Sequence, residues 1–525
     1  MQRPKTRGEW TRREFLATSA AGAGIAVVPG FLIGCGASVK SPAQPAPDAG
    51  PAPVAVGYFA DFGVDEQVVR RILARAMSRG GDFADLYFQH TLTNYIVLQD
   101  GEVNRAYSIV ELGCGVRVLK GDQTGFAFTE DLSEESLASA AATAAVVADG
   151  AGSEGAGAIR RVDTSEHYAI EVPWTNVGID SKIPLLDRAN RVAMDHDERM
   201  IKVQAYMGDT TSRILIATSE GAIVEDYQPM ATIGVTCVAE DGGRREENYF
   251  SWGQRRGFEA LSDGAIADDV AKKAAERTTI LFEAEPPPAG EYPIVLSPGL
   301  SGILLHEAMG HGFEADFNRK GTSVYSEMIG KRIAPEFVTI VDDGTNPHER
   351  GTLNVDDEGS PIQRTVLVEN GVLRTYMHDR ISARHYGVET TANGRRECYR
   401  FPPVPRMRNT YMIDGPHDPE EIVRSVDEGV YAETFTNGQV RIGSGDFSFY
   451  LKNGYLIEKG EITRPVKDAN LIGFGPKVLE NVEMVGNDMA LFSGTGMCGK
   501  DGQRVPVGFG LPTVKCGAIS VGGAE

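Results

Sequence analysis

Two histidines and a glutamate lie close together in the segment His306-Glu307-Ala308-Met309-Gly310-His311. These are the groups of a hydrolytic zinc site, because imidazoles hold the metal and a carboxylate takes a proton from the bound water. The familiar motif spaces its histidines four residues apart on one helical face. Here they are five apart, which separates them by about 140° on a regular helix. A shared metal therefore requires a π-bulge or a break in this turn, and Gly310 is where distortion costs least.

A third ligand must come from elsewhere, because a catalytic zinc usually has three protein ligands and one open position. Physical chemistry favours Cys498, since the glycines beside it let the backbone approach a metal and Lys500 would help to form the thiolate. A buried structural thiol is the alternative reading of this cysteine. Spacing alone leaves five further candidates open: Cys398, Cys516, His348, His378 and His385.

The elements before the motif fall into two similar segments, residues 58–150 and 158–284. Each shows the order helix, about four short strands, helix, which is a weak internal repeat of element order. Asp100-Gly101 and Gly121-Asp122 are turn signals between strands. The expected helices are 66–77, 133–147, 185–200 and 265–278. The expected strands are 86–88, 95–98, 114–118 and 125–128, then 201–206, 214–218, 231–238 and 247–250.

The third segment, residues 289–525, begins after a proline run and is glycine-rich with strand-like patterns. Asn370-Gly371, Asn437-Gly438 and Asn453-Gly454 each predict a hairpin turn. The motif helix is expected to start near Ser297-Pro298 and to end at Gly310 and Gly312. We therefore expect an α+β protein. An N-terminal α/β region of helix–strands–helix units should precede a C-terminal antiparallel β-rich domain with one metal-binding helix.

Composition narrows the class of protein. The 525 residues include 52 basic and 73 acidic side chains, which gives a formal charge of −21. No basic excess exists to neutralise phosphates, so nucleic acid is not expected as a partner. A chain of this length divides into two or three domains, and its hydrophobic content of 42% supports a sizeable core. Six cysteines in so long a chain do not form a disulfide framework.

The first 57 residues are interpreted as a targeting signal followed by a tether, both outside the folded part of the chain. Arg12-Arg13 lies in a segment that resembles a twin-arginine export motif, and a weakly apolar stretch follows it. Residues 32–35 resemble a lipobox that ends in Cys35. We expect a signal peptide at 1–34, a lipid anchor on Cys35 and a Pro/Ala-rich linker at 35–57. The protein would then lie in the periplasm or be anchored to the outer membrane as a lipoprotein; an uncleaved membrane anchor or a plain disordered arm are the alternatives.

Several segments in the same order resemble the TldD/PmbA family of metallopeptidases, and specifically its TldD branch. The resemblance runs from about Phe59 to the C-terminus. PmbA-like members lack the metal motif, so its presence is typical of the catalytic branch. Typical members are cytoplasmic, and the export signal is a departure from them. The segments that carry the resemblance are 125–128, 306–319, 341–344, 356–359, 393–397, 405–410 and 497–503.

The resemblance implies zinc (Zn²⁺) held by His306, His311 and Cys498, with Glu307 as general base. It implies cleavage of unfolded or extended peptides in an enclosed cavity, by a dimer formed with a PmbA/TldE-like paralogue or with itself. The glycine-rich sheet around the site is expected to hold the substrate as an added strand. A non-catalytic metal-binding subunit and an envelope binding lipoprotein are the alternatives. The intact Glu307 argues against the first, and a closed four-ligand zinc site would favour the second.

Two sets of charged residues have no role fixed by the sequence. The carboxylates near 342 and 357 could bind calcium or a peptide amine, although such runs more often form turns. Three arginines could hold a peptide carboxylate or form structural ion pairs. The acidic residues are Asp342, Asp343, Asp356, Asp357 and Glu358, and the arginines are Arg395, Arg396 and Arg406.

Overall fold

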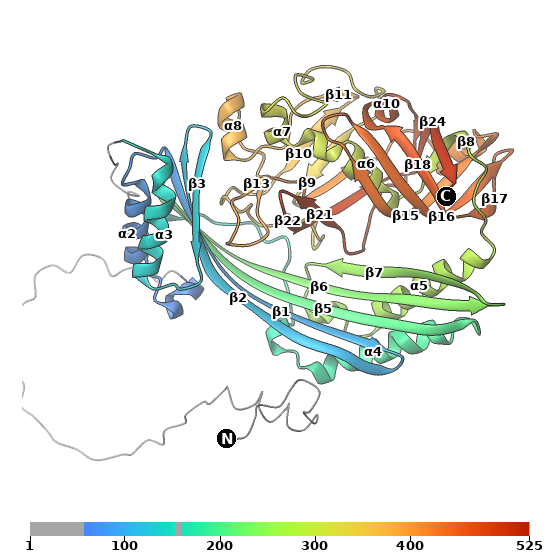
Figure 1. The fold of residues 1–525 in the computed structure, drawn as a ribbon, viewed down its shortest axis with the longest axis horizontal. Coiled ribbons are helices and arrows are strands. Elements are labelled where there is room, and N and C mark those ends of the chain that lie inside the picture. The colour runs from blue at the N-terminus through green and yellow to red at the C-terminus, as the bar shows by residue number, and fades with distance from the viewer. Residues whose placement is uncertain (1–56, 151, 153–158, 524–525) are drawn as a thin grey trace, which may run out of the picture. The chain divides into compact units, whose positions relative to one another are not determined.

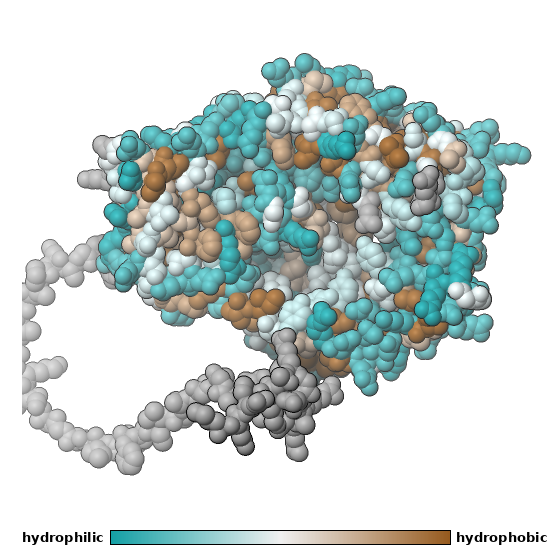
Figure 2. Space-filling view, viewed as in Figure 1, coloured by the Kyte–Doolittle hydropathy of each residue, from teal (hydrophilic) through white to brown (hydrophobic). Residues whose placement is uncertain are grey.

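The computed structural model describes residues 57–150, 152 and 159–523. The expected signal peptide, Cys35 and the linker up to residue 56 lie outside the described residues. Helices combine with mainly antiparallel sheets, which confirms the α+β class (Figure 1). No helix in the described ranges is long and apolar enough to cross a membrane. Hydrophilic residues cover most of the face shown in Figure 2, in keeping with the charge of −21.

The first half of the described chain forms one long sheet in the order β3-β2-β1-β5-β6-β4, with β7 also paired to β6. β1 and β5 pair at its centre, from Asp85 opposite Thr218 to Gln99 opposite Gln204. Segments 58–150 and 158–284 therefore share a sheet. Its strands are β1 (Phe83–Gln99), β2 (Glu102–Lys120), β3 (Gln123–Thr129), β4 (Arg160–Arg161), β5 (Met200–Thr218), β6 (Ala222–Asp241) and β7 (Arg244–Gln254).

Two pairs of helices cover this sheet, and the order helix, three strands, helix occurs twice. α2 (Glu66–Met77) and α3 (Glu134–Ala144) pack on β1 to β3, while α4 (Ile179–Met194) and α5 (Ala265–Thr279) pack on β5 to β7. The Asp65 side chain caps α2 by accepting the Val68 N–H at 2.8 Å. α4 begins earlier than predicted, because Pro184 lies inside the helix and does not mark its start.

Several short strands predicted from the sequence are parts of longer ones. Residues 86–88 and 95–98 both belong to β1, and 201–206 and 214–218 both belong to β5. Gln89, Thr91 and Thr93 break the apolar pattern within β1, yet the backbone pairing continues through them. Their polar side chains line a cavity, which is why hydrophobicity falls without the strand ending. The turns at Asp100-Gly101 and at 121–122 lie where predicted.

The C-terminal part contains two large sheets in its described residues. The first has the order β11-β10-β9-β14-β23-β20, and the second β15-β8-β24-β18-β16-β17 with β19 on β24. β8 pairs parallel with β15 and β14 parallel with β23, while the other pairings are antiparallel. The first consists of β9 (Ile340–Asp343), β10 (Arg364–Glu369), β11 (Val372–Leu373), β14 (Asn409–Met412), β20 (Ala490–Leu491) and β23 (Gly508–Leu511). The second consists of β8 (Gly290–Leu296), β15 (Glu428–Val440), β16 (Asp446–Glu458), β17 (Glu461–Val466), β18 (Ala469–Phe474), β19 (Val482–Val485) and β24 (Val514–Gly523).

Smaller elements connect these sheets. β21 (Met497–Lys500) and β22 (Gln503–Pro506) form a hairpin, and β12 (Gly394–Arg395) pairs with β13 (Val404–Pro405). The remaining helices of the described C-terminal part are short: α6 (Ile303–Ala308), α7 (Ala315–Arg319), α8 (Arg380–Tyr386), α9 (Pro419–Arg424) and α10 (Gly475–Glu480).

One of the three Asn-Gly hairpin predictions is confirmed and two are wrong. Asn370-Gly371 joins β10 to β11, with φ of 49° and 76° at the two residues. The other two pairs lie inside β15 and β16. A Cβ on Gly438 would lie 2.2 Å from the Phe449 ring, so this glycine permits close packing and does not form a turn. The buried Asn453 side chain accepts hydrogen bonds from Asn248 and Thr434, which fixes it within the sheet.

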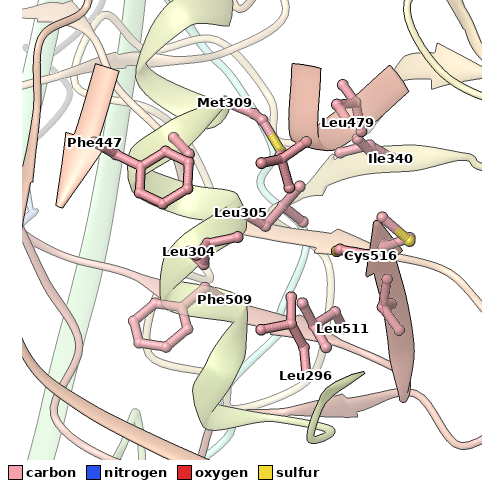
Figure 3. Close-up of a cluster of buried hydrophobic side chains, with 14 of the residues drawn as sticks. Leu296, Leu304, Leu305, Met309, Ile340, Phe447, Leu479, Phe509, Leu511 and Cys516 are labelled. Atoms are coloured by element: carbon pink, nitrogen blue, oxygen red, sulfur yellow. The ribbon is translucent and has the colours of Figure 1, made fainter. Parts of the chain in front are cut away.

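α6 is the predicted motif helix, and it is shorter than expected. A 3₁₀ turn at Leu300–Gly302 precedes it, and Gly302 caps it without a side-chain hydrogen bond. The start near Ser297 is therefore wrong, because Gly299 has a φ of 80° and turns the chain before the helix begins. Apolar side chains from several strands surround α6, as Figure 3 shows. The helix that carries the first histidine is thus fixed on several sides by the core.

Candidate metal centre

The motif helix breaks between its two histidines, as the five-residue spacing requires. α6 ends at Ala308, Met309 leaves helical geometry with φ of −129° and ψ of −47°, and a 3₁₀ turn follows at Gly310–Phe313. The predicted break is confirmed, but Met309 absorbs the distortion rather than Gly310. A Cβ on Gly310 would lie 2.3 Å from the sulfur of Met407, so glycine is needed here for close packing. The Met309 side chain enters the apolar cluster of Figure 3.

This break brings His306 and His311 together, and β21 adds Cys498 to them. The ligand atoms of these three side chains all lie within 4.8 Å of one another. Cys498 Sγ lies 3.5 Å from His311 Nε2, and the two imidazole rings are 5.2 Å apart at 83°. Two ligands, one nitrogen and one sulfur, on a tetrahedral zinc lie roughly 3.5 Å apart, given ordinary bond lengths.

The chemistry of the three donors also fits a metal ion. Neither ring nitrogen of the buried His306 has a hydrogen-bond partner. Burial alone would raise the pKa of the Cys498 thiol, but His311 and His306 beside it bring the pKa well below its ordinary value. A thiolate next to unpartnered imidazole nitrogen is a donor set that suits zinc. Among the described residues, His306, His311 and Cys498 form the group that could hold a metal ion.

Glu307 and Glu314 each lie beside a different ring nitrogen of His311. Glu307 Oε2 lies 3.8 Å from Nε2, and the Glu307 side chain is 23% exposed, so the carboxylate can meet a molecule from solvent. Glu314 Oε2 lies 2.9 Å from Nδ1 and is buried. A carboxylate on the second nitrogen fixes the tautomer and direction of a metal-binding imidazole. Sequence reasoning missed Glu314, although its position three residues after His311 was a usable signal.

Lys500 holds Glu314 and does not contact the thiol. Its Nζ lies 3.1 Å from Glu314 Oε2 and 2.7 Å from Asp316 Oδ1, and it donates to the Pro405 carbonyl at 2.9 Å. Burial would raise the pKa of Glu314, but Lys500 and His311 together lower that pKa to about 2. The expectation that Lys500 promotes the Cys498 thiolate is therefore wrong. The two histidines have that effect, and Lys500 orders the carboxylate behind one of them.

The other candidate third ligands lie away from the motif histidines. His348 contacts the Arg255 carbonyl, and His378 packs among the rings of Tyr376 and Tyr386. The remaining three candidates have other surroundings: His385 lies beside Tyr386, Cys398 beside Arg400, and Cys516 within the apolar cluster around α6.

The acidic residues that the sequence left without a role bind groups of the protein itself. Asp342 accepts hydrogen bonds from Arg408 Nε, Asn393 and Thr410 at 2.7 to 2.8 Å. Asp356 accepts backbone N–H groups from residues 358, 360 and 394. These contacts use the carboxylate oxygens for structure.

The three arginines differ from one another. Arg396 pairs with Asp85 at 3.3 Å and connects the C-terminal part to β1. Arg406 donates to the Cys498 carbonyl and so fixes the backbone of that residue. Arg395 donates to the carbonyls of Met407 and Pro506 at 2.6 and 2.8 Å, with no carboxylate partner in the described residues. The first two have structural roles, and Arg395 faces a cavity.

Three family models match successive parts of the chain. All describe PmbA/TldA metallopeptidases: domain 1 matches residues 84–148, the central domain 172–282 and the C-terminal domain 289–523. A structure of TldE from Thermococcus kodakarensis has the same fold, with a TM-score of 0.69 at 18% identity over 87% of this chain and all of its own.

Curated relatives cover nearly the same length at higher identity. The metalloprotease TldD homolog of Buchnera aphidicola is 39% identical over 88% of this chain and 96% of its own length. That of Haemophilus influenzae is 40% identical over 85% of this chain and 94% of its own. With all three domain models matched in order, the chain belongs to the PmbA/TldD family and is a TldD-like metalloprotease.

Proposed function

We propose that this protein is a zinc-dependent peptidase that hydrolyses peptide bonds in unfolded or extended polypeptides. The observation that carries the proposal is the grouping of His306, His311 and Cys498, with their donor atoms within 4.8 Å and a partly exposed carboxylate beside them. Two imidazoles and a thiolate are zinc ligands found at catalytic sites that keep a fourth position open. When bound there, zinc acts as a Lewis acid that polarises a carbonyl and activates water.

The side chains around the ligands supply the remaining chemistry. Glu307 is placed to accept a proton from the attacking water and to return it to the leaving amine. Glu314 accepts the Nδ1 hydrogen of His311, which directs Nε2 towards Cys498. Arg406 fixes the Cys498 backbone, so two of the ligands are held from behind by hydrogen bonds. Such support keeps the ligand geometry ordered before substrate arrives.

The preference for extended polypeptide is supported by the space beside the site. A cavity of about 340 Å³ lies between the long sheet and the β21–β22 hairpin. That volume is in the range of ligand pockets and is far too small for a folded domain. We propose that the substrate enters as an extended strand recognised mainly by its backbone.

Metal analysis and a peptide digest test this function together. Purified mature protein should carry about one zinc per chain, and chelation should abolish cleavage of an unstructured peptide library until zinc is restored. Glu307→Gln should retain zinc and lose cleavage. A zinc-loaded wild-type protein that cleaves nothing, or a Glu307→Gln variant with full activity, would contradict the proposal. Mass spectrometry of the digest distinguishes cleavage at the ends of peptides from cleavage within them.

We also propose that the protein works as a dimer with a second copy of this chain. The edge of β2 from Glu102 to Val110 is paired with β1 on one side, while β3 pairs only from Cys114 onwards. Val103, Ile109 and Val110 are exposed along this edge, which no second strand of the described residues pairs. Such an edge with apolar side chains is open to an identical strand from a symmetric partner. Light scattering should give a dimer that Ile109→Lys with Val110→Lys converts to monomer. Wild-type protein that forms no homodimer but copurifies with a PmbA/TldE-like paralogue would instead show that the dimer is a heterodimer.

For location, we propose export by the twin-arginine route and a lipid anchor on Cys35, on sequence grounds alone. Replacing Arg12-Arg13 by Lys-Lys should leave precursor in the cytoplasm, and the mature chain should fractionate with envelope membranes. Unchanged export of the Lys-Lys variant would exclude the twin-arginine route. A soluble mature form that starts after Cys35 would exclude the lipid anchor.

A further inference from the structure

The cavity beside the metal centre has two unlike walls. One wall is the face of β1, β5 and β6 that carries the hydroxyl and amide side chains of Gln89, Thr91 and Thr210. The other includes Met497 and Pro506, which are opposite each other in the β21–β22 hairpin (Figure 1). The next rung of that hairpin pairs Cys498 with Val505. Neighbouring residues of a strand point to opposite faces, so Met497 faces the cavity while the buried Cys498 faces the metal centre, and their Cα atoms are about 3.8 Å apart.

Three arginines line this cavity without a carboxylate partner among the described residues. Arg395, Arg255 and Arg350 are 2%, 4% and 7% exposed. Arg350 donates to the Gly496 carbonyl at 2.8 Å and otherwise meets only the thioether sulfurs of Met230 and Met497. Arg395 donates to two carbonyls and leaves its Nε without a partner.

Of the three arginines, Arg255 has the fewest hydrogen-bond partners. Its guanidinium has no hydrogen-bond partner in the described part of the chain, and its buried Nε is among the unsatisfied atoms. The group lies 5.5 Å from the centre of the Tyr168 ring. A buried charge without a counter-charge is costly, so three guanidinium groups around one cavity favour the binding of an anion.

Four other charged groups line the cavity, and two of them, Arg396 and Glu111, are ion-paired. Arg396 pairs with Asp85, and Glu111 pairs with Arg400 at 2.5 Å. Glu397 accepts the backbone N–H of Arg504 at 2.8 Å. Asp357 accepts the backbone N–H of Arg396, so Asp357 and Glu397 are two lining carboxylates without an ion pair among the described residues, against three guanidinium groups. Burial lowers the pKa of Arg350 and of Arg395 to about 10, so both remain charged at neutral pH.

We propose that Arg255, Arg350 and Arg395 bind a carboxylate of the peptide substrate in this cavity, whose Arg350 donates to the Gly496 carbonyl two residues before Cys498. Guanidinium groups bind carboxylates through paired, charge-assisted hydrogen bonds, while the hydroxyl-bearing wall accepts neutral peptide groups. The carboxylate is either the C-terminus of the substrate or an aspartate or glutamate side chain. This inference rests on the proposed peptidase function and adds a substrate class to it, namely peptides with an acidic group.

Peptide binding to the zinc-loaded Glu307→Gln protein tests the proposal without requiring turnover. The probe is an unstructured peptide of about eight residues, labelled with fluorescein at its N-terminus and free of acidic side chains, made as the C-terminal acid and as the amide. A second pair consists of two amidated peptides, one with a single internal aspartate and the other with asparagine at the same position. Fluorescence anisotropy should show tighter binding of the acid or of the aspartate peptide by about tenfold to a hundredfold, as expected for hydrogen bonds to a charged group.

The first pair identifies a terminal carboxylate and the second a side-chain carboxylate. Arg350→Gln should abolish the difference, whereas Arg504→Gln, which removes an exposed arginine from the same hairpin, should leave it unchanged. Arg350→Lys keeps the charge and serves if Arg350→Gln does not fold. Equal binding of acid and amide in both pairs, or no binding of any peptide, overturns the proposal. If the preference is found but wild-type protein cleaves none of the probes, the peptidase function fails while the carboxylate site stands.

Discussion

Two buried polar clusters of the C-terminal part differ in how they use their atoms. Around Asp342, arginine, asparagine and threonine side chains all donate to one carboxylate. Around His306, both ring nitrogens are buried and unpartnered, with a thiolate and a second imidazole nearby. Since buried polar groups are nearly always hydrogen-bonded, the first cluster is nearly complete as it stands, with Arg408 Nη1 left unpartnered, and the second is built around an additional atom. An imidazole with neither nitrogen bonded, next to a thiol and a second imidazole, therefore distinguishes the functional cluster from the structural one.

The largest effect should follow from removing one ligand side chain of the incomplete cluster, the one around His306. His306→Ala, His311→Ala or Cys498→Ala should each lose the bound metal and all measurable cleavage, since a zinc site with two protein ligands is weak. Elemental analysis and a peptide digest measure both. The variants should remain folded by circular dichroism, because these side chains make few other hydrogen bonds. Full zinc occupancy in Cys498→Ala would show that a different residue is the third ligand.

Disrupting the other cluster, the one around Asp342, should lower the stability of the protein and leave metal binding unchanged. Asp342→Asn leaves the Arg408 guanidinium, which is fully buried, without a counter-charge. We expect a loss of unfolding free energy on the order of 3 to 5 kcal/mol, measured by urea denaturation. Zinc per folded molecule should stay unchanged. Metal loss at full stability would reverse the assignment of the two clusters.

A smaller effect should follow from loosening a ligand without removing it. Glu314→Gln keeps a group near His311 Nδ1 but removes its charge, and metal affinity should fall by about tenfold to a hundredfold. Competition with a chelator measures the affinity. Asp316→Asn is the matched control, because Asp316 contacts Lys500 and not the ring. An equal loss in both variants would mean that the Lys500 cluster acts only through local stability.

The smallest effect concerns a buried imidazole that has no neighbouring ligands. Burial lowers the pKa of His378 to about 4, below the value of about 6.5 in the unfolded chain. Between these values the unfolded state binds the proton, so stability should fall as the pH falls from about 6.5 towards 4, by about 2 kcal/mol at pH 5. His378→Gln should flatten this dependence in urea denaturation at several pH values. His385→Gln, at a half-exposed position, should not; an unchanged pH dependence in His378→Gln would mean that the pKa of His378 is the same in the folded and unfolded chain.

The local features of this chain could be predicted from the sequence, and the long-range ones could not. Helix α2 matches its prediction residue for residue, because capping and apolar spacing lie within a dozen residues. The break between the histidines followed from helical geometry alone. Asn453, by contrast, looks like a turn residue because its partners Asn248 and Thr434 are far away in the sequence. The same holds for Arg255, which carries no sequence signal that it faces a cavity.

The candidate site shows the same division. Cys498 was favoured from its flanking glycines, yet Gly496 is required by the approach of the Val507 carbonyl, to which a Cβ would lie 2.5 Å away. The right residue was thus chosen partly for a packing reason that the sequence does not display. The role of Lys500 depends on α7 and the loop before it, which no spacing rule connects to β21.

The separation of the candidate ligands along the chain determines when the metal site can form during protein synthesis. Cys498 follows His311 by 187 residues, and β24 must then pair with β8 to complete the sheet behind the motif helix. At ordinary rates of protein synthesis, roughly 10 to 40 s pass between the two ligands. A growing chain therefore presents two histidines without the thiol, and all three candidate ligands are available only after Cys498 has been made. Until that moment the nascent metalloprotease lacks a ligand that the proposed cleavage of unfolded polypeptides requires, so it cannot cut neighbouring chains or itself by that route.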